Sequence, residues 1–329
     1  MEQYKKFQCV RILKTGFITS MALSPDGTIF ACGETDYTCK YQSISVFDLN
    51  TGQRICTFEI FGRAVFAEFI AISPNGKHLV WNTGRITVGD LTTGQEICRI
   101  SSEDEGFNKE LSSIIISPDG ERIIGFSSKI AKAFDLKTGK EIYSFQAASD
   151  LVKFIGTSPD GDTIIGNLGN VITLWNLKTG QEISSPTVKL RNLRTKSELR
   201  SFKALSNPIK FVAMNSHSQT LVSVNCNDTI TLWDLKVRKE IRTIEWRSDK
   251  GRSLVVSFDC QIFIDFYYGK VGKSEGVTIW DLYRGEKIKT IASDAVQCQS
   301  LVFSANQHTI VYPSGDWGIG ELVKVWRLL

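Results

Sequence analysis

One twelve-residue unit, repeated along the chain, constrains the fold more than any other feature of the sequence. At Ile230–Ile241 it is ITLWDLKVRKEI, a strand that ends in Trp-Asp, a polar turn and the start of a second strand. Variants of this unit are centred on seven anchor positions: Phe47, Gly89, Phe134, Trp175, Trp233, Trp280 and Trp326. The intervals between them are 42, 45, 41, 58, 47 and 46 residues. A period near 40–45 residues with about four short strands per repeat predicts a β-propeller.

A second marker precedes the first four anchors. It has the pattern Ser-Pro-x-Gly and begins at Ser24, Ser73, Ser117 and Ser158. Proline presets one turn dihedral and glycine tolerates a positive φ, so the pattern predicts tight turns between the first two strands of each repeat. In the last three repeats the corresponding segments are NSHS, SFDC and SANQ, and the pattern is lost.

Together these motifs resemble the WD-repeat β-propeller family over essentially the whole chain. The resemblance implies an all-β fold, a seven-bladed β-propeller of four-stranded antiparallel blades, in a single domain over residues 1–329. It also implies that the Ser-Pro-x-Gly turns and the polar turns after the anchor residues lie on one face, and that the variable loops lie on the other.

The chain departs from the family pattern in one respect. The Gly-His pair that precedes the innermost strand is missing from every repeat; blade 5 keeps Ser223, Asp228 and Trp233, with Leu205 near the place of the histidine. Blades 1, 2 and 3 also lack the tryptophan, so we expect the packing between their strands to be more purely apolar.

The last anchor, Trp326, is followed by only three residues, which leaves no outer strand for the seventh blade. The segment FQCVRIL at residues 7–13 resembles the outer strands RICTF and EIRTI of other repeats. We therefore predict that a strand at about 6–13 pairs with a strand at about 323–329 and closes the ring, because this pairing removes a sheet edge.

Composition narrows the class of protein. Hydrophobic residues make up 42% of the 329 residues, and the net charge is only +4 with both signs interspersed. This balance argues against a global electrostatic field for nucleic acid or membrane. We find no apolar segment of the kind that forms a signal peptide or a membrane span, so we expect a cytoplasmic protein without a membrane partner, whose eight cysteines are reduced.

The largest departure from the repeat is a basic insertion at residues 186–207, between blades 4 and 5. Its six cations oppose one acidic residue, Glu198, and they are Lys189, Arg191, Arg194, Lys196, Arg200 and Lys203. Three interpretations stay open: a solvated loop, a site for an acidic protein partner, and a site for nucleic acid through phosphate contacts. Only Phe202 could stack on a base, which argues against single-stranded nucleic acid.

Four aromatic residues stand in otherwise polar loops of blades 1, 6 and 7: Tyr37, Tyr41, Tyr268 and Trp317. Protein interfaces favour such side chains because they combine a large contact area with a polar tip. These blades are neighbours in a seven-bladed ring, so we propose a shared aromatic patch as a partner-binding site. The alternative is that each side chain folds back onto its own blade.

The sequence contains no pattern that indicates a catalytic or metal-binding site. The three histidines, His78, His217 and His308, fall at or just after turns of different blades, where they cannot converge on one metal. The repeated aspartates Asp48, Asp90, Asp135, Asp234 and Asp281 begin turns, where a carboxylate accepts nearby backbone N–H groups. Cys56 and Cys98 recur at one position of successive outer strands, which indicates packing. We therefore expect no catalytic residue, metal or cofactor.

The sequence predicts a non-enzymatic scaffold or adaptor that binds one or more proteins through its loop-bearing face, alone or as a subunit of a larger complex. An alternative is binding of an anionic polymer such as nucleic acid through residues 186–207. A third hypothesis is a propeller enzyme with its site at the central channel, but the inner strands are dominated by apolar residues.

Overall fold

The structure is a computed structural model, and every regular element among the residues that it describes is a β-strand. Those residues are 7–36, 38, 41–60, 67, 69–100, 111, 113–117, 119–127, 130–146, 152–157, 163–168, 171–176, 191–192, 197–198, 209–215, 220–225, 227–234, 239–246, 253–257, 260–267, 275–293, 301–304, 309–314 and 321–328. The chain forms two compact units, Met1–Arg99 with Ser248–Leu329, and Ile100–Arg247, which are described separately.

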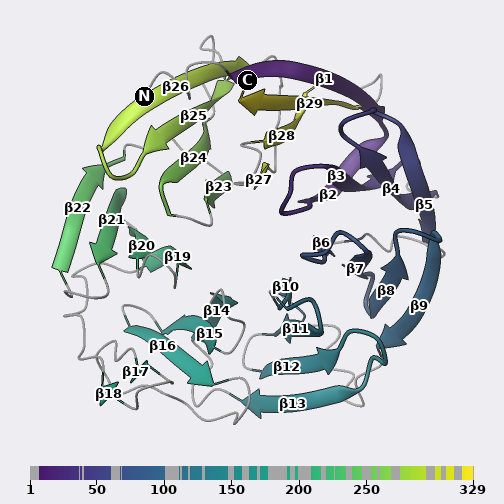
Figure 1. The fold of residues 1–329 in the computed structure, drawn as a ribbon, viewed down its shortest axis with the longest axis horizontal. Helices are drawn as coiled ribbons and strands as arrows, with labels where there is room; N and C mark the ends of the chain where they lie inside the picture. The colour runs from purple at the N-terminus through teal and green to yellow at the C-terminus, as the bar shows by residue number, and fades with distance from the viewer. Residues whose placement is uncertain are drawn as a thin grey trace. The chain divides into compact units, whose positions relative to one another are not determined.

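The first unit contains four antiparallel sheets of four strands each, numbered here as blades (Figure 1). Blade 1 comprises β2 (Phe17–Leu23), β3 (Ile29–Thr35), β4 (Gln42–Asp48) and β5 (Arg54–Ile60), and blade 2 comprises β6 (Phe69–Ile72), β7 (His78–Asn82), β8 (Ile86–Asp90) and β9 (Gln95–Ile100). Blade 6 comprises β23 (Ser253–Val256), β24 (Ile262–Tyr267), β25 (Glu275–Asp281) and β26 (Glu286–Ser293). Blade 7 comprises β27 (Val302–Ser304), β28 (Thr309–Ser314), β29 (Glu321–Leu328) and β1 (Phe7–Thr15).

The second unit contains blades 3, 4 and 5 and a separate two-stranded hairpin. Blade 3 comprises β10 (Ser113–Ile116), β11 (Arg122–Phe126), β12 (Ile130–Asp135) and β13 (Glu141–Gln146). Blade 4 comprises β14 (Val152–Thr157), β15 (Thr163–Leu168) and β16 (Val171–Asn176). Blade 5 comprises β19 (Ile209–Asn215), β20 (Thr220–Asn225), β21 (Thr229–Asp234) and β22 (Lys239–Glu245), and the hairpin joins β17 (Arg191–Asn192) to β18 (Ser197–Glu198). Six of the seven blades thus have the predicted four strands among the described residues.

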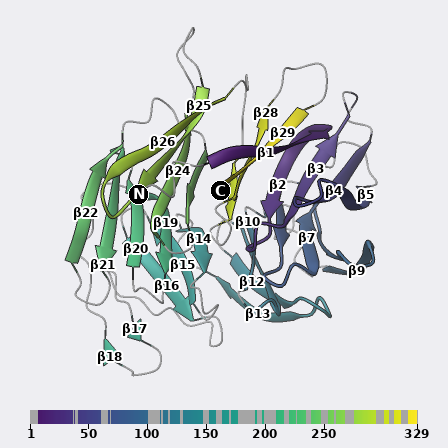
Figure 2. The same cartoon turned by 45° about the horizontal axis from the view of Figure 1, so that its top comes forward.

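The predicted pairing of the two ends of the chain is confirmed. Strand β1 runs antiparallel to β29, from Phe7 opposite Leu328 to Thr15 opposite Glu321 (Figures 1 and 2). The N-terminal strand is therefore the fourth strand of blade 7, and both ends of the sequence belong to one sheet. That the whole of residues 1–329 forms one domain and one closed ring stays a prediction.

Apolar side chains of neighbouring blades of the first unit meet in shared cores. Blades 1 and 2 share a cluster that contains Ile44, Val46 and Leu79, and blades 7 and 1 share one that contains Phe30, Val311 and Val325. The buried strands of these blades carry β-branched and aromatic residues, either at alternate positions or in continuous runs. Such strands are expected in a sheet that is covered on both faces.

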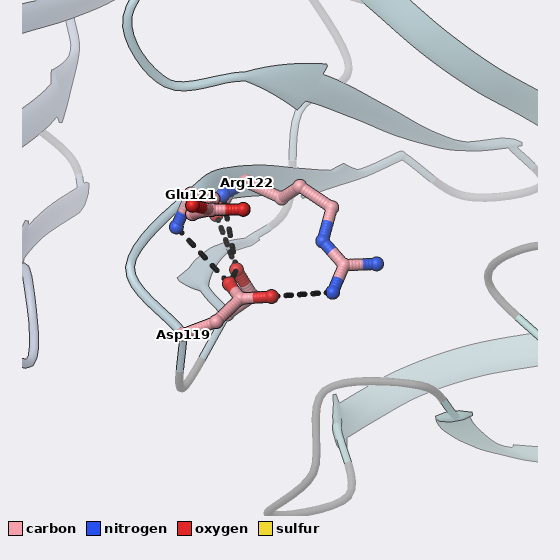
Figure 3. A network of polar contacts seen from close by, with 4 residues as sticks. Asp119, Glu121 and Arg122 are labelled. Carbon is pink, nitrogen blue, oxygen red and sulfur yellow. Dashed lines mark hydrogen bonds and ion pairs between the residues drawn. The ribbon is translucent and has the colours of Figure 1, made fainter.

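The Ser-Pro-x-Gly turns are built around the serine. Gly27 N donates to Ser24 O over 2.8 Å, and Ser24 Oγ accepts from Ile29 N over 2.9 Å. The same two bonds recur from Ser73 and from Ser117. In blade 3, Figure 3 shows Asp119 accepting from Glu121 N and from the Arg122 guanidinium. Although burial acts in the opposite direction, the hydrogen bonds from Ser117 and Arg122 lower the pKa of Asp119.

Blade 6 keeps this turn although the sequence motif is lost there. Cys260 N donates to Ser257 O over 2.8 Å, and Ser257 Oγ accepts from Ile262 N over 2.8 Å. Cys260 has a φ of 56° where Gly27 has 70°. A side chain in this left-handed region costs about 1–2 kcal/mol, so the turn is held by its hydrogen bonds against the preference of its fourth residue.

The anchor residues pack inside the blades as the repeat predicts. Phe47 and Phe134 are buried, Trp233, Trp280 and Trp326 are partly buried, and Trp175 lies in β16. Trp233 Nε1 donates to Ser223 Oγ over 3.2 Å, so two of the residues that blade 5 keeps from the family pattern are hydrogen-bonded to each other.

Whether the indole of an anchor tryptophan has a hydrogen-bond partner depends on the residue that occupies the position of Ser223 in its own blade. In blade 6 it is Asp265, which accepts from Trp280 Nε1 over 3.3 Å. In blade 7 it is the buried Tyr312, and Trp326 Nε1 has no hydrogen-bond partner within the described residues. An unpaired buried donor costs about 1–3 kcal/mol, which the apolar packing around this indole must offset.

Blade 2 replaces its missing anchor side chain from the neighbouring strand. Position 89 is glycine, and Trp81 occupies on β7 the place that Ser223 has on β20. The Trp81 ring lies 5.0 Å from that of Phe58, and a Cβ atom on Gly89 would fall 2.9 Å from Trp81 and 2.6 Å from Phe58. The expected apolar packing is thus observed here, and in blade 1 through Phe30 and Phe47.

Blade 3 does not follow that expectation. Lys132, in the middle of the anchor strand β12, is buried, and its Nζ lies 3.2 Å from Glu141 Oε2 on β13. The prediction of more purely apolar packing was wrong at this position, because the long lysine side chain reaches a carboxylate on the more exposed outer strand.

Candidate partner-binding surface

The loop between β3 and β4 carries the one aromatic residue of the predicted patch that the structure describes. Asp36 organises this loop: its Oδ2 accepts from Thr38 Oγ1 over 2.7 Å and its Oδ1 accepts from Tyr41 N over 3.4 Å. Asp36 N donates to Tyr41 O over 3.2 Å, which closes the loop at its base. Short polar side chains commonly fix turns in this way.

Tyr41 points into solvent from this loop, with 78% of its surface exposed. The next residue, Gln42, begins β4 and is only 6% exposed, as expected where successive side chains point to opposite faces. Within the described residues neither amide atom of Gln42 has a hydrogen-bond partner. Tyr41 is therefore exposed at the end of the loop, directly before a strand that begins with a buried residue.

The other aromatic residues of the predicted patch, Tyr37, Tyr268 and Trp317, lie outside the described residues. Their convergence with Tyr41 on one surface stays a prediction.

Part of the basic insertion forms a short hairpin that the sequence pattern did not predict. Arg191 lies opposite Glu198, and Asn192 lies opposite Ser197. The register thus places the single acidic residue of the insertion across from one of its cations. The other five, Lys189, Arg194, Lys196, Arg200 and Lys203, lie outside the described residues. Two residues per strand give no periodicity to detect, so no sequence signal could have found this hairpin.

Asp48, Asp90, Asp135 and Asp281 serve their turns, as predicted. The turn after Asp234 lies outside the described residues. Asp90 Oδ1 accepts from the backbone N–H groups of Thr92 and Thr93, and Asp135 Oδ1 from those of Lys137 and Thr138. The bond from Thr93 lowers the pKa of Asp90, and the side-chain bond from Thr138 lowers that of Asp135. These carboxylates are stabilised as anions by their own turns, so they are poorly suited to proton transfer at neutral pH.

Metal and thiol chemistry finds no support in the described residues. No group of three or more His, Cys, Asp and Glu side chains there could hold a metal ion. Burial, and after it the charge of Asp90, raises the pKa of Cys56, so this thiol stays protonated and packs as predicted. In the same part of the chain no helix is long and apolar enough to cross a membrane.

Two arginines at the blade 7–blade 1 contact were missed by the sequence analysis. Arg11 on β1 donates to three carbonyls of one turn of blade 1: Nε to Leu49 (3.2 Å), Nη1 to Thr51 (2.9 Å) and Nη2 to Asn50 (2.5 Å). Arg327 on β29 donates to Asn50 Oδ1 over 2.8 Å. Burial, then the charge of Arg11, lowers the pKa of Arg327. Single arginines without a recurring position carry no signal that a repeat comparison can detect.

Comparison with known proteins identifies one repeat. The family model "WD domain, G-beta repeat" matches residues 7–41, which run from β1 through β2 and β3 to Tyr41. No curated protein matches the chain. The matched repeat and the six four-stranded antiparallel sheets among the described residues support the predicted resemblance to the WD-repeat β-propeller family.

Proposed function

We propose that this protein is a non-enzymatic scaffold that binds a protein partner through the loops between the second and third strands of its blades, with Tyr41 as a contact residue. WD40 repeats are generally protein-interaction scaffolds. The observation that carries the proposal for this chain is the exposed Tyr41 ring on a loop tied by Asp36.

The physical argument concerns the cost of binding. An exposed tyrosine has only two side-chain torsions, and the backbone of Tyr41 is already hydrogen-bonded to Asp36, so little conformational entropy is lost when a partner covers it. Its ring gives a large apolar area and its hydroxyl a hydrogen bond at the rim. Tyrosines of this kind are enriched among the residues whose truncation costs about 2 kcal/mol or more in binding, a thirtyfold loss of affinity.

The test is an affinity pull-down with the full chain as bait, comparing the wild type with Tyr41→Ala. The matched control is Tyr283→Ala, which removes another surface tyrosine, 40% exposed, from the turn between β25 and β26. We expect a partner that binds the wild type and the Tyr283→Ala protein but not the Tyr41→Ala protein. Equal recovery by all three baits contradicts the proposal.

A third variant decides the role of the basic insertion. In it Lys189, Arg191, Arg194 and Lys196 are changed to Ser, which removes four of the six cations. If this variant alone loses the partner, the insertion is the binding site and the Tyr41 loop is not. If the wild type instead recovers nucleic acid that is released by moderate salt and lost from this variant, binding of an anionic polymer replaces the scaffold proposal.

A further inference from the structure

We propose that the outer edge of β1 is a self-association site, at which the β1 strand of a second copy of this chain pairs antiparallel to form a two-fold dimer. The inference is independent of Tyr41 and rests on a comparison of β1 with the outer strands of the other blades.

The outer strands can be aligned residue by residue because they share a β-bulge. In five of them the bulge lies opposite the anchor residue of the neighbouring strand. The anchor residue and the residue before it pair with two outer-strand residues that are two positions apart. The outer-strand residue between those two is therefore unpaired. The unpaired residue is always aliphatic: Val10, Ile55, Ile142, Ile241 or Ile288. Ile97 has the same place in the motif GQEI of β9.

On either side of this aliphatic residue, the other outer strands carry polar side chains exposed to solvent. The residue before it is charged in every case: Arg54, Glu96, Glu141, Glu240 and Lys287. The second residue after it is polar in every case: Thr57, Arg99, Ser144, Thr243 and Thr290. Bulges and charges on an exposed edge strand are the means by which proteins prevent another strand from pairing there.

Strand β1 keeps the bulge but lacks both polar positions. Cys9 replaces the charged residue, and Ile12 replaces the polar one. Ile12 is 53% exposed and Val10 is 38% exposed, and Gln8 and Cys9 are exposed as well. The edge is the outer side of a four-stranded sheet, because β1 pairs only with β29 among the described strands. It therefore combines unpaired backbone groups with an exposed apolar surface.

A second copy of β1 fits this edge better than a strand of unrelated sequence. In an antiparallel pair centred between Val10 and Ile12, each of these residues faces the other one in the second copy. Lys14 then faces the uncharged Gln8. Arg11 lies at the centre, but its guanidinium is already bound to the carbonyls of Leu49, Asn50 and Thr51 of its own unit. Two-fold pairing thus covers both apolar surfaces at once, and it places the two Arg11 residues opposite each other at the axis, each with its guanidinium held by its own unit.

The pairing is short, because the bulge at Val10 interrupts the regular edge. Such a contact buries much less than the roughly 1,200–2,000 Å² of a stable interface, so we expect a monomer–dimer equilibrium that depends on concentration. Sedimentation velocity or light scattering over a concentration series of the full chain measures its dissociation constant.

The decisive variant gives β1 the residues of the other outer strands, as Cys9→Glu with Ile12→Thr. Both side chains are on the surface, so an unchanged melting temperature verifies that the variant is folded. We expect its dissociation constant to rise at least about tenfold, because two apolar contacts are lost and each copy brings a carboxylate to the pairing edge.

The matched control is Ile55→Thr on β5, which removes an exposed aliphatic residue from an edge that keeps Arg54 and Thr57. It should dimerise like the wild type. A wild type that stays monomeric at every concentration, or a dimer that the Cys9→Glu, Ile12→Thr protein retains, overturns the proposal. So does a dimer that the Ile55→Thr change weakens equally, because the contact would then involve β5.

Discussion

Position 89 is the anchor without a side chain, and Trp81 of the adjacent strand supplies the missing aromatic ring. In blade 5 the arrangement is reversed, with Trp233 at the anchor and Ser223 at the place of Trp81. In each of these two blades a single tryptophan fills the space between the anchor strand and the strand before it. The tryptophan can stand on either of the two strands. We therefore predict that the pair in blade 2 can be exchanged.

In the proposed exchange, Trp81→Ser with Gly89→Trp recreates the pair of blade 5. Trp81→Ser alone leaves a cavity and should cost about 3–5 kcal/mol of unfolding free energy, and Gly89→Trp alone forces a ring against Phe58 and Trp81. The double variant should be more stable than either single variant, with an interaction energy of at least about 1 kcal/mol in a double-mutant cycle from urea unfolding.

Gly89→Ala is the small-scale version of the same test. Its Cβ atom meets Phe58 and Trp81 at distances well below van der Waals contact, so a loss of about 1–3 kcal/mol is expected. Additive effects in the cycle, or a Gly89→Ala protein as stable as the wild type, would show that blade 2 repacks in some other way.

At the scale of single elements, the turn after the innermost strand depends on its serine more than on its proline or glycine. Blade 6 has neither of the latter, yet Ser257 makes the same bonds as Ser117 of blade 3. We predict that Ser257→Ala and Ser117→Ala each lower the unfolding free energy by about 1 kcal/mol, the usual value of one such bond. Thermal unfolding of the two variants measures the effect. A loss at Ser117 without one at Ser257 would mean that the SFDC turn is held by other contacts.

The same turns show what the sequence could and could not predict. The Ser-Pro-x-Gly motifs at Ser24, Ser73 and Ser117 and the aspartates at the later turns predicted their positions correctly, because proline, glycine and aspartate each act locally. Cys260 at a positive φ could not be predicted, because no proline or glycine marks this turn, which the hydrogen bonds of Ser257 hold. The role of Trp81 in place of an anchor side chain was also missed. A comparison of repeats looks for residue types at fixed positions, whereas the core requires only that a side chain of the right volume fills the space.

The candidate site was less predictable than the fold. Tyr41 was singled out as an aromatic residue in a polar loop, and it is exposed, but no sequence pattern indicated the loop geometry set by Asp36. The apolar edge of β1 was visible in the sequence only after the bulges had aligned the outer strands, because the bulge shifts the alternation of side chains by one residue.

At the scale of the whole molecule, the first unit contains both ends of the chain, and β1 joins them. Its Leu13 is buried in the core shared by blades 7 and 1, its backbone pairs along the length of β29, and Arg11 binds three carbonyls of blade 1. Through these contacts between residues far apart in sequence, the stability of the first unit depends on β1, although β1 is only a small part of the chain.

We therefore predict that removal of residues 1–14 destabilises the protein far more than its length suggests. The truncated chain loses the burial of Leu13, the ladder to β29 and the Arg11 bonds, so its melting temperature should fall by roughly 10 °C or more. Arg11→Ala keeps the strand and removes only the bonds to blade 1, so a smaller fall, about 2–6 °C, should result. Calorimetry of the three proteins separates these contributions. An unchanged melting temperature after truncation would mean that β29 is stable as an edge, and that the pairing of the two ends does not hold the unit together.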